Sequence, residues 1–117
     1  MANYQRGDTV LVWHVWPEPD GRVGKKRRPG IIYDIIAEDH YCILIFGTDR
    51  TGKIPGFKVE QKSSEGRKMK IDKDSFINLS KIVPLKRVDI IKQIGFCPEE
   101  ILNKIEEVID EFGIERP

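Results

Sequence analysis

Arg28 and Thr48 are of residue types that can bind a phosphate group. The planar guanidinium of an arginine matches the oxygens of a phosphate group, and a threonine hydroxyl can donate a further hydrogen bond to the same oxygens. Arg28 directly precedes an apolar segment and Thr48 closely follows another. If residues 30 to 46 form a β-hairpin, the two ends of that hairpin lie side by side. The topology therefore predicts that Arg28 and Thr48 lie close together.

A strongly basic segment leads to Arg28. Residues 22 to 28 contain five cations and no acid, and the compensating acids are concentrated in residues 99 to 115. This asymmetry predicts an anionic partner at one end of the fold. The predicted nucleic-acid-binding residues are Lys25, Lys26, Arg27 and Trp16, with Trp16 as a base-stacking group. The alternative is that this segment is a solvated loop of about a dozen residues that binds no nucleic acid, with both tryptophans in the core.

The rest of the chain predicts a small β-rich fold followed by helices. Short β-branched and aromatic segments alternate with turn residues, which is typical of a barrel or sandwich. Towards the C-terminus the apolar spacing changes to that of helices. We expect a single domain over residues 1–117, with a barrel at about 6–85 and C-terminal helices at about 86–113. The expected strands are 9–16, 30–37, 41–46, 56–61 and 76–85, and the expected helices are 88–94 and 98–112.

Composition and residue spacing indicate which classes of protein the sequence fits. The net charge is +1 and 39% of the 117 residues are hydrophobic, as in ordinary globular proteins. Cys42 and Cys97 form no Cys-x-x-Cys unit, Cys42 lies in an apolar run, and no cluster has metal-ligand spacing. His14 and His40, an alternative acid–base pair, lie far apart in the sequence. The polar first residues and the lack of a long apolar stretch predict a cytoplasmic protein without a signal peptide or membrane span.

The order of motifs resembles the MazF/PemK family of toxins. The chain opens with Arg6-Gly7-Asp8 before an apolar strand, and Arg28-Pro29 runs into Gly30-Ile31-Ile32. Residues 45–48, 57–59, 74–79 and 91–95 are similar to later strands and the closing helix of that family. The resemblance covers residues 5 to 113.

The resemblance implies an SH3-like β-barrel of the MazF/PemK/CcdB type, usually a homodimer. It further implies a metal-independent endoribonuclease that cleaves single-stranded RNA without a cofactor, and a cognate antitoxin that occupies the RNA groove. Arg28 and Thr48 stand at the positions of the family's catalytic groups, and Ser75 is a further candidate. Each of these residues has a structural role as its alternative. Arg28 would be a solvated cation, Thr48 a turn residue and Ser75 a polar residue at the start of a strand.

One departure from the family pattern concerns proton transfer. The family commonly carries a glutamate shortly before Arg-Pro, and here that position falls at Val23. Glu18 and Asp20, in the same loop, are candidate substitutes. Two other functions therefore remain open beside the ribonuclease. One is a non-catalytic nucleic-acid-binding barrel, and the other is an inhibitor of a cellular protein such as a topoisomerase.

Overall fold

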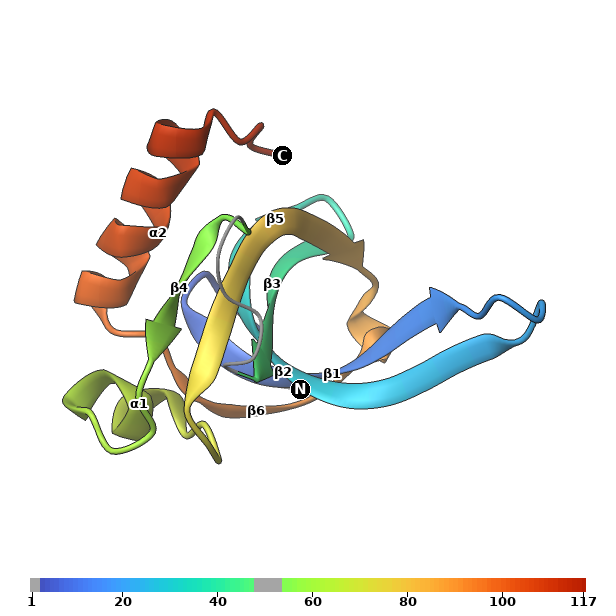
Figure 1. Cartoon of the computed structure of the whole chain (residues 1–117), viewed down its shortest axis with the longest axis horizontal. Helices are drawn as coiled ribbons and strands as arrows, with labels where there is room; N and C mark the ends of the chain where they lie inside the picture. The colour runs from blue at the N-terminus through green and yellow to red at the C-terminus, as the bar shows by residue number, and fades with distance from the viewer. Residues whose placement is uncertain (1–2, 48–53) are drawn as a thin grey trace.

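Six antiparallel strands form one sheet in the computed structural model, which describes residues 3–47 and 54–117. Figure 1 shows this sheet with a long helix beside it. The order of the strands across the sheet is β4-β5-β3-β2-β1-β6. The elements are β1 (Asp8–Pro17), β2 (Val23–Ile36), β3 (Asp39–Gly47), β4 (Gly56–Val59), α1 (Ser64–Met69), β5 (Ser75–Leu85), η1 (Arg87–Asp89), β6 (Ile90–Phe96) and α2 (Glu99–Phe112).

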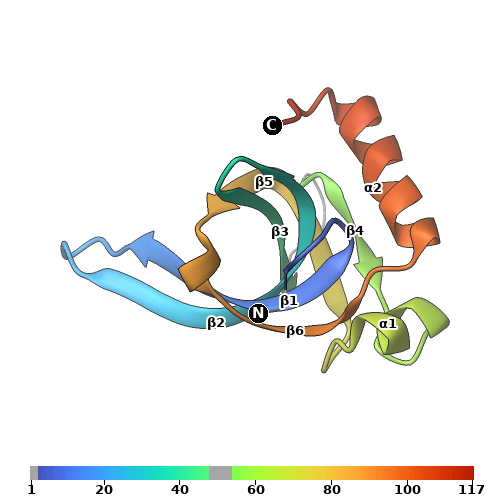
Figure 2. The ribbon, with the colours of Figure 1, turned by 180° about the vertical axis from the view of Figure 1, so that it is seen from behind.

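The sheet curls into an incomplete barrel. Figure 2 shows the strands from behind, wrapped around a common axis with α2 outside the curl. Among the described strands, the edge strands β4 and β6 each pair with one neighbour, so the barrel is open between them. The predicted fold class, mainly β with an SH3-like barrel of the MazF/PemK type, is confirmed. None of the helices in the described part is long and apolar enough to cross a membrane.

Two apolar cores lie on opposite faces of the sheet. Because successive side chains of a strand point to opposite faces, each central strand contributes to both cores. Ile32, Cys42 and Leu44 pack inside the curl with Val10 and Val12. The other core lies under α2 and includes four buried residues of this helix: Ile101, Ile105, Val108 and Ile109. The predicted helix at 98–112 is thus confirmed, and Cys42, which lies in an apolar run of the sequence, is buried.

The basic segment is a β-hairpin, not the long loop predicted from its polarity. β1 and β2 pair as far as Pro17 and Val23, which leaves only residues 18–22 as the turn. Gly21, with φ of 87°, permits this turn. In Figure 1 the end of the hairpin projects beyond the sheet. We call residues 13–27 the arm. In the arm, Trp13 and Val15 of β1 pair with Arg27 and Lys25 of β2, so the stems of these cations lie along apolar side chains, which the composition of a single strand does not show.

The predicted helix at 88–94 is also wrong, because these residues belong to η1 and β6. β6 pairs with β1, and the register shifts twice along the pair. Such bulges interrupt the simple alternation of a strand, so the apolar residues Val88, Ile90, Ile91 and Ile94 imitate helical spacing. Gly95, which follows the predicted helix, lies in β6 as well.

The polar segment 62–68 contains the short helix α1, which the sequence did not predict. The Ser63 hydroxyl accepts a hydrogen bond from the Gly66 backbone at 3.0 Å and caps the helix. Its end lies against β6 so closely that a Cβ atom on Gly95 would be 2.6 Å from the Lys68 carbonyl oxygen. α1 therefore lies beside the edge strand at the opening of the barrel.

Candidate nucleic-acid interface

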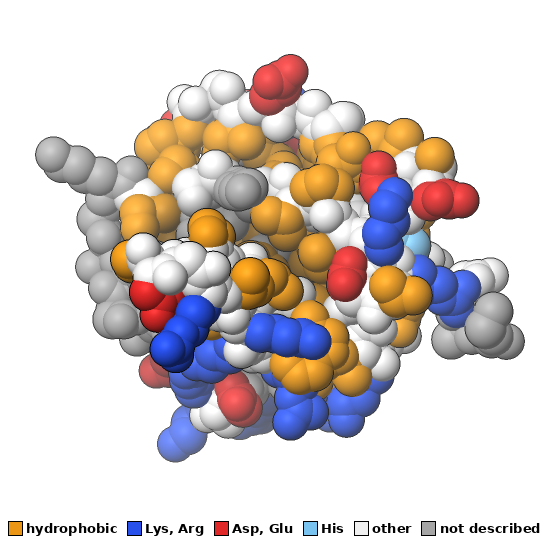
Figure 3. Space-filling model, turned by 90° about the vertical axis from the view of Figure 1, so that its right-hand side faces the viewer, with side chains coloured by type: hydrophobic (Ala, Val, Ile, Leu, Met, Phe, Trp, Pro, Cys, Tyr) orange, Lys and Arg blue, Asp and Glu red, His pale blue; other side chains and the backbone are white. Residues whose placement is uncertain are grey.

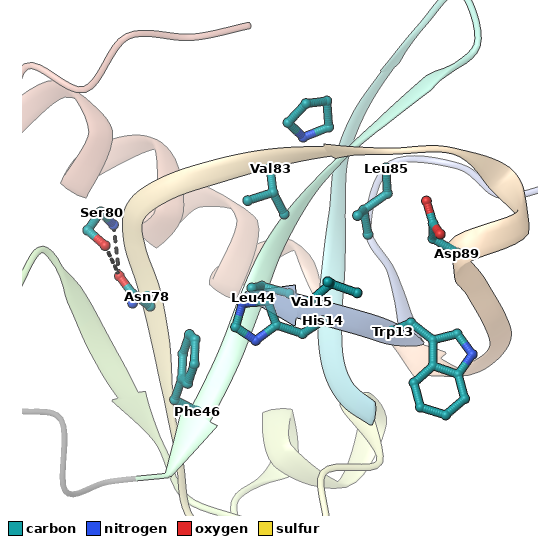
Figure 4. A pocket seen from close by; sticks show the side chains of 11 residues that line it. Trp13, His14, Val15, Leu44, Phe46, Asn78, Ser80, Val83, Leu85 and Asp89 are labelled. Carbon is teal, nitrogen blue, oxygen red and sulfur yellow. Dashed lines mark hydrogen bonds between the residues drawn. The ribbon is translucent and has the colours of Figure 1, made fainter. Parts of the chain in front are cut away.

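A pocket of about 470 Å³ lies inside the curl, between β1 and β5. Figure 4 shows Val83 and Leu85 pointing from β5 towards His14 on β1, with Phe46 and Leu44 beside it. Asn78 and Ser80 add polar groups at one side of the pocket. A pocket of this size that combines apolar walls with a few polar groups suits a small organic group such as a base.

Arg28 lies beside this pocket and is held by two of the residues that line it. Its Nε–H donates a hydrogen bond to Nδ1 of His14 at 3.0 Å. Its guanidinium carbon lies 4.4 Å from the centre of the Phe46 ring, which is cation–π distance. The side chain is half-buried rather than freely solvated. These contacts give the guanidinium a defined position at the pocket, unlike that of an ordinary surface cation.

The contact between His14 and Arg28 follows from the register of the hairpin. Val12 is paired with Arg28 and His14 with Lys26, so these four side chains share one face. His14 also packs against Trp16, with ring centres 5.2 Å apart, and its ring meets the Phe46 ring edge-on at 6.1 Å. Sequence reasoning did not place His14 at this site, because only the register of β1 and β2 reveals it.

His40 lies elsewhere. It is the second residue of β3, and its ring contacts Tyr4. Five residues of β3 lie between it and Phe46, and the six steps correspond to roughly 20 Å along an extended strand. Because His14 contacts the Phe46 end of β3, the structure does not bring the two histidines together as an acid–base pair.

The other cations of the arm fall on two faces. Lys26 shares the face of His14 and Arg28, whereas Lys25 and Arg27 lie on the opposite face over Trp13. The Lys25 ammonium is 4.3 Å from the centre of the Trp13 ring. All three side chains are exposed. Figure 3 shows Lys and Arg side chains gathered along one edge of the molecule, next to apolar ones. The arm thus combines cations with aromatic rings on both faces.

Trp16, the predicted stacking residue, is half-buried against the arm itself. Its indole N–H donates to Glu18 at 2.9 Å. Its ring lies on Gly24, where an added Cβ would be only 2.2 Å from the ring. The ring therefore fixes the end of the arm next to His14.

The candidate loop acids lie in the turn, away from Arg28. Glu18 binds Trp16, and Asp20 pairs with Arg22 at 3.2 Å. The turn lies beyond Val23. Four residues of β2 separate Val23 from Arg28, and the five steps span roughly 17 Å of strand. The structure does not bring either carboxylate together with Arg28.

The remaining predicted site residues are Ser75 and Thr48. Ser75 is buried at the start of β5, where it pairs with Gly47 and its hydroxyl donates to the Lys73 carbonyl at 2.8 Å. Thr48 lies outside the described residues, although Gly47, its neighbour, ends β3 next to Phe46. The strand that ends there is the one whose Phe46 contacts Arg28.

The two cysteines are not activated nucleophiles. Burial raises the pKa of Cys42 to about 12, and burial likewise raises the pKa of Cys97 to about 12. Both thiols are therefore protonated at neutral pH. In residues 3–47 and 54–117, no group of three His, Cys, Asp or Glu side chains has an arrangement that could hold a metal ion.

The sequence of the chain was compared with models of known protein families. The family model of the PemK-like, MazF-like toxins of type II toxin–antitoxin systems matches residues 5–113. The chain belongs to this family. The match includes the whole sheet and α2, and membership in the MazF/PemK family implies a cognate antitoxin as a partner. A search of curated proteins found no match.

Proposed function

We propose that this MazF/PemK-family protein is an endoribonuclease toxin that cleaves single-stranded RNA without a metal ion. The observation that carries the proposal is the position of Arg28. The guanidinium is held beside a pocket by His14 and Phe46, at the base of a cationic arm. A fixed guanidinium that is accessible from such a groove suits a phosphate group of a bound polynucleotide.

RNA carries its own nucleophile, the 2′-hydroxyl next to each phosphate. Attack by that oxygen on phosphorus forms a 2′,3′-cyclic phosphate and releases the 5′-oxygen of the next nucleotide. Negative charge accumulates on the phosphate oxygens in the transition state, and Arg28 stabilises it. In the unbound protein the Nε–H of Arg28 is bonded to His14, so the two terminal amino groups are the donors that an arriving phosphate meets first. Thr48 donates a second hydrogen bond to the same oxygens.

The arm and the pocket together select single-stranded RNA. Lys26 continues the cationic face of Arg28 and binds the phosphates next to the scissile one. The pocket receives an unstacked base between Phe46 and the side chains of β5, where Asn78 and Ser80 offer hydrogen bonds. The bases of a duplex remain stacked and cannot enter. The cognate antitoxin occupies the same groove and blocks it.

The decisive test incubates the purified protein with mixed-sequence single-stranded RNA in the presence of EDTA. We expect discrete fragments that end in a cyclic phosphate. Arg28→Ala should reduce the rate by roughly 10²–10³-fold, the effect of losing one transition-state donor. Arg27→Ala is the matched control, because Arg27 is the preceding arginine but lies on the opposite face of the arm. Equal rates for Arg28→Ala and the native protein would refute the role of Arg28.

A second candidate function is that of a non-catalytic binder of single-stranded nucleic acid. The arrangement of Glu18 and Asp20 favours it, because neither carboxylate reaches Arg28 as a proton acceptor. Such a protein would bind the RNA in the same assay and leave it intact. Binding that weakens with salt, without any cleavage, would therefore favour this candidate over the ribonuclease.

The proposed active form is a homodimer. Edge strands β4 and β6 each leave one side unpaired by the described strands, and Phe96 at the end of β6 is half-exposed. A dimer would bury surface that a chain of this size leaves in water. Light scattering should give twice the chain mass of 13.5 kDa, and a single-chain mass at assay concentrations would refute the dimer.

A further inference from the structure

His14 and Arg28 form a pair at the edge of the pocket. The distance between Nε of Arg28 and Nδ1 of His14 is 3.0 Å. Because the guanidinium N–H is the donor, Nδ1 must be the acceptor, and an imidazolium could not take that role. The arrangement therefore holds a neutral imidazole whose lone pair on Nδ1 points at the guanidinium. The ring is half-buried and is braced by Trp16 and Phe46.

A base for RNA cleavage must lie near the group that binds the scissile phosphate. The reacting 2′-hydroxyl is attached to the ribose next to that phosphate, so its proton acceptor has to be within a few ångströms of the phosphate-binding guanidinium. His14 meets this condition, whereas Glu18 is bound to Trp16 and Asp20 to Arg22 near the end of the arm. Val23, at the position of the family's usual glutamate, is an exposed apolar residue.

We propose that His14 is the general base of the RNA cleavage, paired with Arg28. This inference rests on the proposed ribonuclease function and adds a catalytic residue to it. When a phosphate draws the guanidinium of Arg28 towards itself, the lone pair on Nδ1 of His14 becomes the nearest proton acceptor. The pair thus exchanges the Arg28–His14 hydrogen bond for one bond to the phosphate and one to the 2′-hydroxyl.

The reaction balances as a transesterification. The 2′-hydroxyl proton passes to Nδ1 of His14 while the 2′-oxygen forms a bond to phosphorus. The bond from phosphorus to the 5′-oxygen breaks, and that oxygen takes a proton from a water molecule. The imidazolium then loses its proton to solvent, and the neutral ring accepts the hydrogen bond from Arg28 again. No oxidant, reductant or metal takes part in this sequence.

His14→Asn separates a catalytic role from a purely structural one. The Asn side-chain oxygen can take the place of Nδ1 and accept the Nε–H of Arg28, but an amide cannot accept a proton at neutral pH. We expect kcat to fall by roughly 10²–10⁴-fold with KM little changed. His40→Asn is the matched control, because His40 lies at the other end of β3, and it should cleave like the native protein. Far-ultraviolet circular dichroism and thermal unfolding verify that both variants fold.

Two further measurements report on the imidazole itself. The native kcat should rise with pH as the imidazole loses its proton, and this limb should vanish in His14→Asn. The charged groups of the described residues around the ring are Arg28 and Lys26 on β2, Glu18 beyond Trp16, and Asp89 at the far side of the pocket. Added imidazole should partly restore cleavage by His14→Gly.

The outcomes distinguish this inference from the function on which it rests. Native protein that leaves RNA intact would overturn both proposals. Native protein that cleaves RNA, together with His14→Asn that retains cleavage within about threefold, would overturn only the role of His14. Slower cleavage by His14→Asn with the native pH profile would mean that His14 only positions Arg28. Failure of imidazole to rescue His14→Gly would lead to the same conclusion. Loss with both signatures supports the general base.

Discussion

The arm offers a sharp test of where RNA binds, because two adjacent lysines lie on opposite faces of it. Lys26 pairs with His14 and shares the face of Arg28, whereas Lys25 lies over Trp13 on the other face. Both side chains are exposed, and both substitutions to glutamine remove one positive charge. If RNA follows the face of Arg28, Lys26→Gln should weaken binding much more than Lys25→Gln.

The magnitude follows from counterion release. Each phosphate contact with single-stranded nucleic acid contributes about 0.7 to the slope of log K against log salt concentration. Removing the Lys26 contact should therefore lower the slope by about 0.7. Over a tenfold range of salt this amounts to roughly a fivefold change in affinity, largest at low salt and absent near 1 M. Lys25→Gln should change the slope by less than half as much, because its ammonium does not meet a phosphate on that face.

The assay measures binding without cleavage. Fully 2′-O-methylated RNA has no free 2′-hydroxyl to attack phosphorus, so it stays intact in the presence of the native protein. Fluorescence anisotropy of the labelled strand between about 50 and 500 mM salt gives the slope for each variant. Thermal unfolding controls for the loss of the Lys25–Trp13 contact, which is present in the native arm.

Two outcomes would refute the reasoning. Equal slopes for Lys25→Gln and Lys26→Gln would mean that RNA does not distinguish the faces of the arm, so the groove of Arg28 would not be its path. A slope for Lys26→Gln identical to that of the native protein would remove the arm from the binding site altogether. Either result would also weaken the assignment of Arg28 to the scissile phosphate.

Two further predictions concern stability away from the pocket. Burial raises the pKa of Glu106, but hydrogen bonds from Tyr33, at 2.6 Å, and Arg116 outweigh it and hold the pKa below its usual value of 4.5. This carboxylate therefore stabilises the fold above about pH 4.5. This contribution is lost as the pH falls through the lower pKa of the folded state. Urea unfolding should therefore show that Glu106→Gln loses less stability on acidification than the native protein does. Parallel curves of unfolding free energy against pH would contradict this. Gly95→Ala should destabilise the protein by about 1–3 kcal/mol, because the new Cβ would be 2.7 Å from the backbone of Met69. Unchanged urea unfolding would show that α1 does not need this close contact with β6.

The parts of the fold that the sequence predicted correctly are those whose apolar pattern is decided locally. The central strands carry continuous β-branched runs, and α2 has an apolar stripe between Pro98 and Gly113, which adopts φ of 62° at the helix end. Each of these signals is contained in one segment and agrees with what tertiary packing requires. No partner segment has to be known in order to read them.

The wrong predictions share the opposite property, since their structure depends on a partner strand. The arm residues on β2 are rich in cations, include a glycine, and resemble a loop until Trp13 and Val15 are placed opposite them. β6 appears helical because its apolar residues follow the two bulges of its pairing with β1. In both cases pairing supplies the stabilisation that local propensity lacks. A sequence read one segment at a time does not contain that information.

The residues of the candidate site also differ in whether a single segment of sequence is enough to find them. Arg28 could be selected from the sequence because Arg28-Pro29 resembles a motif of the MazF/PemK family, whereas its partner His14 could not be selected. His14 meets Arg28 only because Val12, two residues earlier, pairs with Arg28, and a register shifted by one residue would place His14 on the opposite face. The absence of an acid at Val23 therefore does not by itself argue against catalysis. Titratable groups reach Arg28 across the strands as well as along the loop, and the group that does so here is an imidazole at 3.0 Å.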